Sequence, residues 1–363
     1  MLKNSSSYIG GIYYMKDLNW IKNLPWARIG MISLCSVLSL VLIVMIFATA
    51  YIEQMLGLIV RPPVESEATL PSDFYTKPTL PSGYTGPTID PSGVTLPPEP
   101  DIIVAHDQII NIMLVGQDRR EDENYRTRSD AMILCTFNKQ DKTITLTSFM
   151  RDLYVNIPGH GGDKMNAAYA YGGMSLLSKT MKENFGVQVD ATVEVDFSGF
   201  KKVVNTLGGV DIHLTAAEVD YMMTTEWDEL NTDGWSLTPG INRLNGDQAL
   251  AYSRIRAIGY DFERTERQRK VISAVLAKCK SMNSAQANAL LWELLPMVTT
   301  DMTNSQITNY ALELFPLLAS NSMTTQRIPI EGSYTETYVG PLDVVLADTE
   351  INRQFLIETL MPK

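Results

Sequence analysis

Residues 29–52 form the longest uncharged segment of the chain, and this run restricts the possible architectures more than any other sequence feature. As a helix it would rise roughly 36 Å at about 1.5 Å per residue, enough to cross a bilayer core of about 30 Å. Its N-terminal flank is basic, with Lys3, Lys16, Lys22 and Arg28 against Asp17. The positive-inside rule therefore predicts a transmembrane helix at 29–52, a cytoplasmic tail at 1–28 and an extracellular location for everything that follows.

A cleaved signal peptide is the alternative interpretation of this segment, because residues 48–50 (ATA) have the small-residue pattern of a cleavage site. The apolar region of a signal peptide is shorter, about 7–15 residues. We therefore expect an uncleaved anchor, in which Cys35 acts as a small apolar residue.

Proline dominates the segment after the apolar run, where it alternates with serine, threonine and glycine up to Pro100. Such a composition cannot bury a core and favours extended, polyproline-like chain. We expect an extracellular spacer at 53–100 and a folded extracellular domain at 101–363. The formal net charge of −11 argues against nucleic acid as a partner.

From residue 101 onward, short apolar or β-branched runs alternate with helical patterns. Strands are expected at 109–115, 131–137, 143–149, 193–195 and 210–214. Helices are expected at 174–184, 197–207, 247–253, 264–280, 285–295 and 306–318. This alternation indicates an α/β fold, in which helices cover a sheet.

Acids and arginines occur together at the ends of the first three expected strands. Asp118 follows the first strand, Arg128 and Asp130 precede the second, and Arg151 and Asp152 follow the third. Ligands of open α/β sheets bind beyond strand ends of this kind. The pattern therefore indicates a binding site at one edge of the sheet, although solvated loop charges remain the alternative.

A second cluster of arginines surrounds the start of the helix expected at 264–280. We expect that helix to bury Val271 and Val275. The same face of the helix, followed towards the N-terminus in steps of three and four residues, contains Arg264, Arg267 and Gln268. Arg269 and Lys270 would then face solvent. Guanidinium groups suit bidentate capture of phosphate oxygens, so the pattern predicts a pyrophosphate or phosphodiester site that also includes Arg254 and Arg256. Internal ion pairs with Asp261 or Glu266 are the alternative.

Two cysteines fall within the expected folded domain. Cys135 lies in an expected core strand and Cys279 on the buried stripe of the helix at 264–280. We therefore expect two buried thiols without a disulfide, even though the extracellular compartment permits one.

An ordered series of motifs then resembles one protein family. They lie at 111–118 (NIMLVGQD), 128–130 (RSD), 151–155 (RDLYV), 164–169 (KMNAAY), 207–210 (LGGV), 252–256 (YSRIR) and 261–269 (DFERTERQR). Their order over roughly 106–285 is similar to the LytR-CpsA-Psr family of membrane-anchored cell-wall glycopolymer transferases. Met150 departs from the proline that many relatives have there.

The resemblance implies a transferase that moves a glycan-1-phosphate, of teichoic acid or capsular type, from a polyprenyl-pyrophosphate carrier to peptidoglycan. It also implies that Asp118 and Asp130 hold Mg²⁺, with Mn²⁺ as an alternative, and that an apolar slot holds the prenyl chain. In the family, the arginines that match Arg128, Arg151, Arg254, Arg256 and Arg264 grip the pyrophosphate. We count Asp118, Asp130, Arg128 and Arg151 as catalytic, add Arg267 and Gln268 to the pyrophosphate site, and assign support to Asp152, Lys164, Asn166 and Asp261.

The expected fold is therefore an α-β-α sandwich with a central mixed sheet, preceded by one transmembrane helix. Two other functions remain open at this point. The same site could hydrolyse the lipid carrier, because sugar and water can both act as acceptor. A non-catalytic sensor of wall precursors is the second alternative, but paired carboxylates at Asp118 and Asp130 add nothing to pure anion docking unless a cation bridges them.

Overall fold

The computed structural model describes residues 26–61, 79–117, 127–227, 230–318 and 323–363. The chain divides into two compact units, residues 1–54 and 55–363. In the first unit, the described residues belong to helix α2 (Trp26–Leu56). None of the helices searched within the described residues combines the length and the apolarity that a membrane crossing requires.

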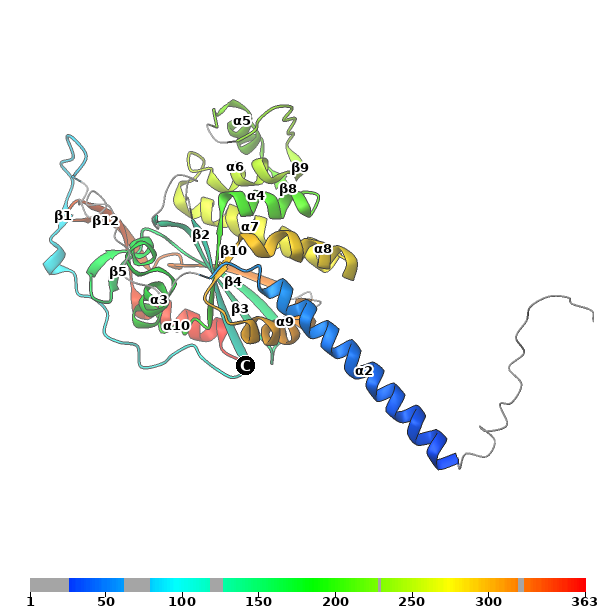
Figure 1. The fold of residues 1–363 in the computed structure, drawn as a ribbon. Helices are drawn as coiled ribbons and strands as arrows, with labels where there is room; N and C mark the ends of the chain where they lie inside the picture. The colour runs from blue at the N-terminus through cyan, green and yellow to red at the C-terminus, as the bar shows by residue number, and fades with distance from the viewer. Residues whose placement is uncertain (1–25, 62–78, 118–126, 228–229, 319–322) are drawn as a thin grey trace, which may run out of the picture. The chain divides into compact units, whose positions relative to one another are not determined.

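A six-stranded sheet forms the centre of the second unit (Figure 1). Its strand order is β10-β7-β2-β3-β4-β11. The β2–β7 and β4–β11 pairs are parallel, and the other three pairs are antiparallel, so the sheet is mixed. The strand bounds are Ile109–Gln117 (β2), Ser129–Asn138 (β3), Thr143–Phe149 (β4), Ala191–Asp196 (β7), Val298–Thr300 (β10) and Met323–Ile328 (β11).

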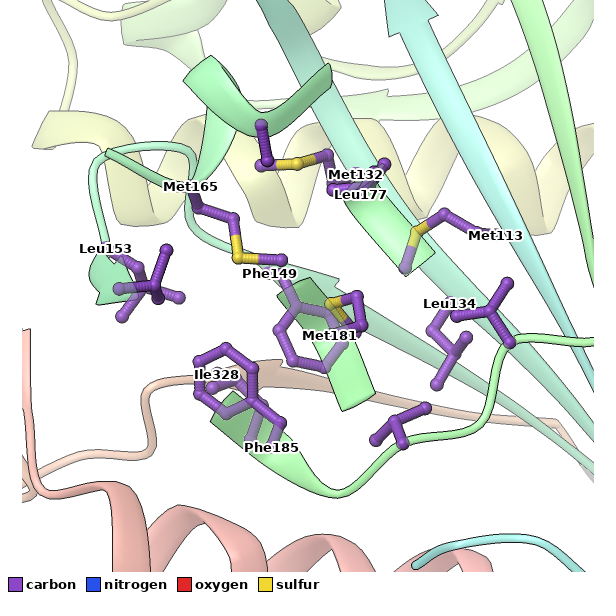
Figure 2. Close-up of a cluster of buried hydrophobic side chains, with 14 of the residues drawn as sticks. Met113, Met132, Leu134, Phe149, Leu153, Met165, Leu177, Met181, Phe185 and Ile328 are labelled. Carbon is purple, nitrogen blue, oxygen red and sulfur yellow. The ribbon is translucent and has the colours of Figure 1, made fainter. Parts of the chain in front are cut away.

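One face of the sheet packs on helices α3 (Met165–Phe185) and α10 (Thr349–Leu360). Figure 2 shows this core, in which Met113, Met132 and Phe149 of the strands meet side chains of α3. The helical partners include Leu177, Met181 and Phe185. Central strands buried on both faces favour near-continuous apolar runs, which β2 and β3 have, whereas β4 (TITLTSF) is buried almost throughout although threonine and serine alternate with its apolar residues.

Helices α7 (Tyr260–Lys280) and α9 (Asn304–Leu318) cover the other face. There Ile133 and Leu146 of the sheet belong to one cluster with Leu314 of α9, and Leu276 of α7 packs against it. Helix α4 (Phe197–Thr206) lies beside β7 and packs on α6 (Gly246–Arg254) and α8 (Ser284–Leu294). The predicted α/β architecture with a central mixed sheet is therefore confirmed.

The smaller elements surround this sandwich. Strands β5 (Tyr154–Ile157) and β6 (Gly161–Lys164) form one hairpin, and β8 (Val210–Leu214) and β9 (Gly240–Leu244) form another pair. Helix α5 (Ala216–Thr224) begins at a capping box between Thr215 and Glu218. The third small sheet has the order β1-β12-β13, from Thr88–Ile89, Tyr334–Val339 and Leu342–Ala347. The part of the chain that the structure describes also contains the single 3-10 turns η2 (Pro91–Gly93) and η3 (Leu295–Met297).

The structure differs from the expected spacer at 53–100 in the part that it describes. Thr88 and Ile89 pair in parallel with Tyr338 and Val339, so this stretch belongs to a sheet. A proline-rich chain can contribute such a strand at a sheet edge, because an edge strand forms hydrogen bonds with a neighbouring strand on one side only and therefore uses only part of its N–H groups. Residues 62–78 of the expected spacer lie outside the described residues.

Residues 285–363, to which the sequence assigned no role, complete both faces and both edges of the central sheet. Strand β11 pairs with β4, β10 pairs with β7, and α9 and α10 lie on opposite faces. The two cysteines of the folded unit are free thiols. Cys135 is buried as expected, whereas Cys279 is partly exposed because its side of α7 is not fully covered.

Candidate functional site

Four elements bring charged side chains together at one end of the central sheet. Asp130 lies at the start of β3, Arg151 directly after β4, Arg256 just beyond α6, and Arg264 in the second turn of α7. The C-terminal end of α6 favours cations, and the N-terminal end of α7 favours the acidic residues that it carries. Gly259 enters α7 with a φ of 74°, a left-handed conformation that favours glycine.

Asp130 is the carboxylate at the centre of this cluster. Its Oδ1 accepts a hydrogen bond from Nη1 of Arg151 at 2.8 Å and lies 3.4 Å from Nη2 of Arg256. Its main-chain carbonyl accepts a bond from Nη1 of Arg264 at 2.9 Å. Three of the predicted arginines therefore converge on one residue, as the sequence indicated.

Asp261 holds Arg264 in place. Nε and Nη2 of Arg264 donate to the two carboxylate oxygens at 2.7 and 3.0 Å, a bidentate ion pair between positions three apart on α7. Burial raises the pKa of Asp261, but the hydrogen bonds and charge of Arg264 outweigh it, and the pKa is lowered. The alternative interpretation of the arginine cluster, an internal ion pair with Asp261, is thus correct for Arg264. The same guanidinium also contacts the main-chain carbonyl of Asp130.

The cations of the cluster are not fully compensated. Burial lowers the pKa of Arg256, and the charges of Arg151 and Arg264 lower it further against the opposing effect of Asp130. For Arg151, burial acts downward but three neighbouring carboxylates outweigh it, so its pKa is raised. Positive charge therefore remains concentrated at Arg256, where an anionic ligand would be stabilised.

Three of the four residues assigned a supporting role lie on the opposite flank of Arg151. Nε of Arg151 donates to Asp152 at 3.3 Å, and Nζ of Lys164 donates to the other oxygen of Asp152 at 2.8 Å. The backbone N–H of Asn166 donates to the carbonyl of Arg151 at 3.2 Å. The β5–β6 hairpin and the start of α3 thus fix the loop that carries Arg151.

A cavity of about 550 Å³ opens beside this cluster, and we call it the main cavity. Its polar end is lined by Asp130, Arg254, Arg256, Arg264 and Gln268. The rest of its wall is apolar and aromatic, from β2, β3, β7, α4, α5, α6 and α7, with Phe197, Phe200, Tyr221, Trp227, Leu250, Ile272 and Leu276 among the lining residues. The carbon of the Arg254 guanidinium lies 5.0 Å from the centre of the Phe197 ring, so this arginine covers the boundary between the two parts.

Helix α7 places its other arginines differently from the sequence prediction. Arg267 is buried as expected, but it pairs with Glu218 at 2.8 Å and donates to the carbonyls of Ile255 and Ile258. It thus supports the loop behind Arg256 and does not line the main cavity. Arg269 was expected to face solvent, and this was wrong: it is only 6% exposed, because β8 and β11 approach that side of α7.

Two predicted residues, Asp118 and Arg128, fall within or beside the gap at 118–126 in the described residues. Asp118 lies outside the described residues, at the end of β2. Arg128 is exposed directly before β3. Among the described residues, no three His, Cys, Asp or Glu side chains converge on a metal position. The carboxylate of Asp130 in the lining of the main cavity nevertheless suits Mg²⁺, which often takes one or two carboxylates together with phosphate oxygens.

The family resemblance implied an apolar slot, but it did not identify the residues that form it. Phe197, Phe200, Tyr221 and Trp227 come from segments whose local pattern is that of ordinary amphipathic helix or loop. Glu218, the buried partner of Arg267, was also missed. Its only local signal is the Thr215–Glu218 spacing of a helix cap, which does not reveal a partner 49 residues away.

Comparisons with known proteins agree with this geometry. Over 214 residues, the chain is 37% identical to a polyisoprenyl-teichoic acid–peptidoglycan teichoic acid transferase, TagT of Bacillus subtilis, covering 58% of this chain and 64% of that protein. It is 36% identical to TagU of Enterococcus faecalis, a protein with the same transferase description, over 56% of this chain and 65% of that protein. Less than two thirds of either relative is therefore matched.

A solved structure of TagT with bound octaprenyl pyrophosphate lipid superimposes with a TM-score of 0.53 at 30% identity. It covers 70% of this chain and 91% of that chain. A family model described as the LytR_cpsA_psr family matches residues 90–352. Because that match spans most of the sequence and includes every described element of the charged cluster, the chain belongs to the LytR_cpsA_psr family.

Proposed function

We propose that this chain is a membrane-anchored phosphotransferase that moves a glycan-1-phosphate, of teichoic acid or capsular type, from a polyprenyl-pyrophosphate carrier to peptidoglycan. The observation that carries the proposal is the main cavity, which joins a long apolar wall to an arginine-rich end. A polyprenyl pyrophosphate joins the same two chemistries in one molecule. The transferase descriptions of the relatives and the octaprenyl pyrophosphate bound to TagT support this assignment.

In the proposed reaction, a peptidoglycan hydroxyl attacks the phosphorus that carries the glycan. A new oxygen–phosphorus bond forms, the bond to the bridging pyrophosphate oxygen breaks, and prenyl phosphate leaves with the electron pair while the hydroxyl loses its proton. Arg151, Arg256 and Arg264 would neutralise charge that spreads over the non-bridging oxygens. Their mutual contacts through Asp130 and Asp261 hold them ready for this role, which avoids reorganisation during the reaction.

We further propose that Asp118 and Asp130 hold Mg²⁺, with Mn²⁺ as an alternative. The support is the position of Asp130 in the lining of the main cavity and the fact that Asp118 directly follows β2 in the sequence, because β2 pairs with β3. A bound divalent ion would neutralise part of the pyrophosphate charge and polarise a phosphoryl oxygen. Asp130 also receives two guanidinium groups on Oδ1, so its charge serves to position arginines whether or not an ion is bound.

The anchor and the location are part of the proposal. Residues 29–52 are uncharged and follow a basic flank, and the apolar side chains from Val41 to Phe47 are exposed. We propose that they cross the cell membrane once, with the N-terminus in the cytoplasm and residues 101–363 outside. Protease added to intact protoplasts should release a soluble fragment. A domain that stays protected until the membrane is breached would contradict this topology.

A binding series tests the substrate class. The full chain should bind prenyl pyrophosphates more tightly as the prenyl chain lengthens, because each additional CH₂ that enters the main cavity contributes up to about 0.8 kcal/mol. Prenyl monophosphates of equal length should bind more weakly, because they offer the arginines fewer oxygens. Binding that is indifferent to chain length, or to the second phosphate, would contradict the assignment.

A further inference from the structure

A second cavity, of about 450 Å³, lies on the opposite side of α7 from the main cavity. We call it the outer groove. On α7, Gln268 and Ile272 face the main cavity, whereas Arg269 and Ser273 face the outer groove. The opposite walls come from β8, the start of α5 and β11, with His213, Thr215, Glu218 and Thr325 among the lining residues.

Arg269 is a buried cation in the wall of this groove. Arg269 is 6% exposed, and its Nε is buried with no hydrogen-bond partner among the described residues. Nη1 lies 3.4 Å from Oγ1 of Thr265, a long contact with a neutral group. Burial lowers the pKa of Arg269 to about 10, with Glu266 acting upward and Arg327 downward. The protein therefore keeps a poorly compensated guanidinium at this position, an arrangement that is unfavourable without an anion.

The carboxylates that line the outer groove are engaged by other cations. Asp211 pairs with Arg243 at 3.0 Å, and Glu266 pairs with Lys270 at 2.7 Å. Glu218 pairs with Arg267 at 2.8 Å. The groove is thus lined by three carboxylates and two cations, and within the described residues Arg269 is the lining charge that has no ion-pair partner.

We propose that the outer groove binds one phosphodiester of a sugar-phosphate or polyol-phosphate chain, with the Arg269 guanidinium as its ligand. A guanidinium presents paired donors that match phosphate oxygens, and a phosphodiester carries one negative charge, which would give Arg269 the anionic partner that it does not have. Hydroxyl, imidazole and paired charged groups around Arg269 suit the hydroxyl groups of such a chain.

The identity of the chain rests on the proposed function. The main cavity and the outer groove are lined by different sides of α7, so a glycopolymer attached to a pyrophosphate in the main cavity would have to pass only one helix, about 10–12 Å across, to reach the outer groove. A phosphate further along that polymer would reach the outer groove within the same molecule, so a weak site would be filled at high effective concentration. The effective concentration therefore favours a phosphate of the donor polymer as the ligand of the outer groove. A separate molecule that carries a carboxylate would not have this advantage. The outer groove would then select donors with phosphate in their repeating unit.

The test is a titration of the full chain with glycerophosphoglycerol, a phosphodiester flanked by two polyol groups, followed by phosphorus NMR. The main cavity is first saturated with farnesyl pyrophosphate so that the probe cannot enter it. We expect saturable binding that Arg269→Gln weakens about tenfold or more, and Arg269→Lys to a smaller extent. Lys139→Gln is the matched control, because it removes one positive charge that pairs with Glu313 on another part of the unit, and it should leave binding unchanged.

Several outcomes would overturn the proposal. They are the absence of saturable binding, equal affinity in Arg269→Gln and wild type, and binding of N-acetylmuramic acid in place of glycerophosphoglycerol. A merely structural role for Arg269 predicts a lower melting temperature in Arg269→Gln, whereas a site kept for a ligand predicts an unchanged or higher one without the probe. If farnesyl pyrophosphate itself fails to bind, the proposed function fails, but Arg269-dependent binding of the probe still supports the outer groove.

Discussion

Replacing Arg267 with methionine should destabilise the folded unit strongly, because it removes one partner of a buried ion pair. The side chains of Arg267 and Glu218 are 5% and 8% exposed, and Nε and Oε1 are 2.8 Å apart. Removing one partner of such a pair typically costs about 3–5 kcal/mol, most of which comes from the charge left unpaired. We expect a decrease of that size in the free energy of unfolding, measured by urea denaturation of the full chain.

Two controls make this prediction specific. Lys270→Met removes a cation from the same helix, but its pair with Glu266 is about half exposed on both sides, so the change should be about 1 kcal/mol or less. The double variant Glu218→Gln/Arg267→Met leaves no unpaired buried charge and should recover much of the loss. A loss in Arg267→Met no larger than in Lys270→Met, or no recovery in the double variant, would refute the reasoning.

The pH dependence of this effect follows from Glu218. Burial raises its pKa, but hydrogen bonds from Thr215 and Arg267 outweigh burial, so the folded-state pKa lies below the ordinary glutamate value of 4.5. The pair therefore contributes stability that is present above about pH 4.5 and is lost as the pH falls through the folded pKa. The difference between wild type and Arg267→Met should shrink on acidification below that point.

The remaining predictions concern the charged cluster and the cysteines. Arg256→Ala should lower kcat/KM by about ten- to a hundredfold, since it loses charged contacts to the pyrophosphate, and an unchanged value would remove Arg256 from the site. Asp118→Asn and Asp130→Asn should each abolish divalent-dependent turnover, and activity that persists in chelator would refute the metal proposal. Burial raises the pKa of Cys135 to about 12, so alkylation at pH 8 followed by mass spectrometry should label Cys135 only after unfolding.

The sequence predicted those parts of the fold and site that depend on local patterns. The strands at 109–115 and 143–149 and the helix at 264–280 were placed within a few residues, because apolar periodicity and buried runs report directly on them. Strand β11, by contrast, has the polar sequence MTTQRI and is specified by its pairing with β4 and not by its own pattern. Long-range pairing of this kind leaves little trace in a local window.

Arg269 shows the same limit within the site. Helix periodicity predicts one buried face on α7, and Arg264 and Arg267 are buried as this predicts. Helix α7 is instead covered on a second side, where β8 and β11 line the outer groove. Whether a charged residue on a helix faces solvent depends on such neighbours, and these are set by topology.

The central claim is that the protein binds a lipid-linked glycan in the main cavity and transfers it to peptidoglycan. One measurement tests this claim most directly. The full chain is incubated with a polyprenyl-pyrophosphate glycan labelled in the sugar, with and without peptidoglycan fragments, and the label is followed. The account predicts that label moves to peptidoglycan through a phosphodiester, and that Arg264→Ala, which loses contacts to Asp130 and Asp261, prevents it. Release of free glycan phosphate at the same rate with and without peptidoglycan would show hydrolysis of the carrier and contradict the account.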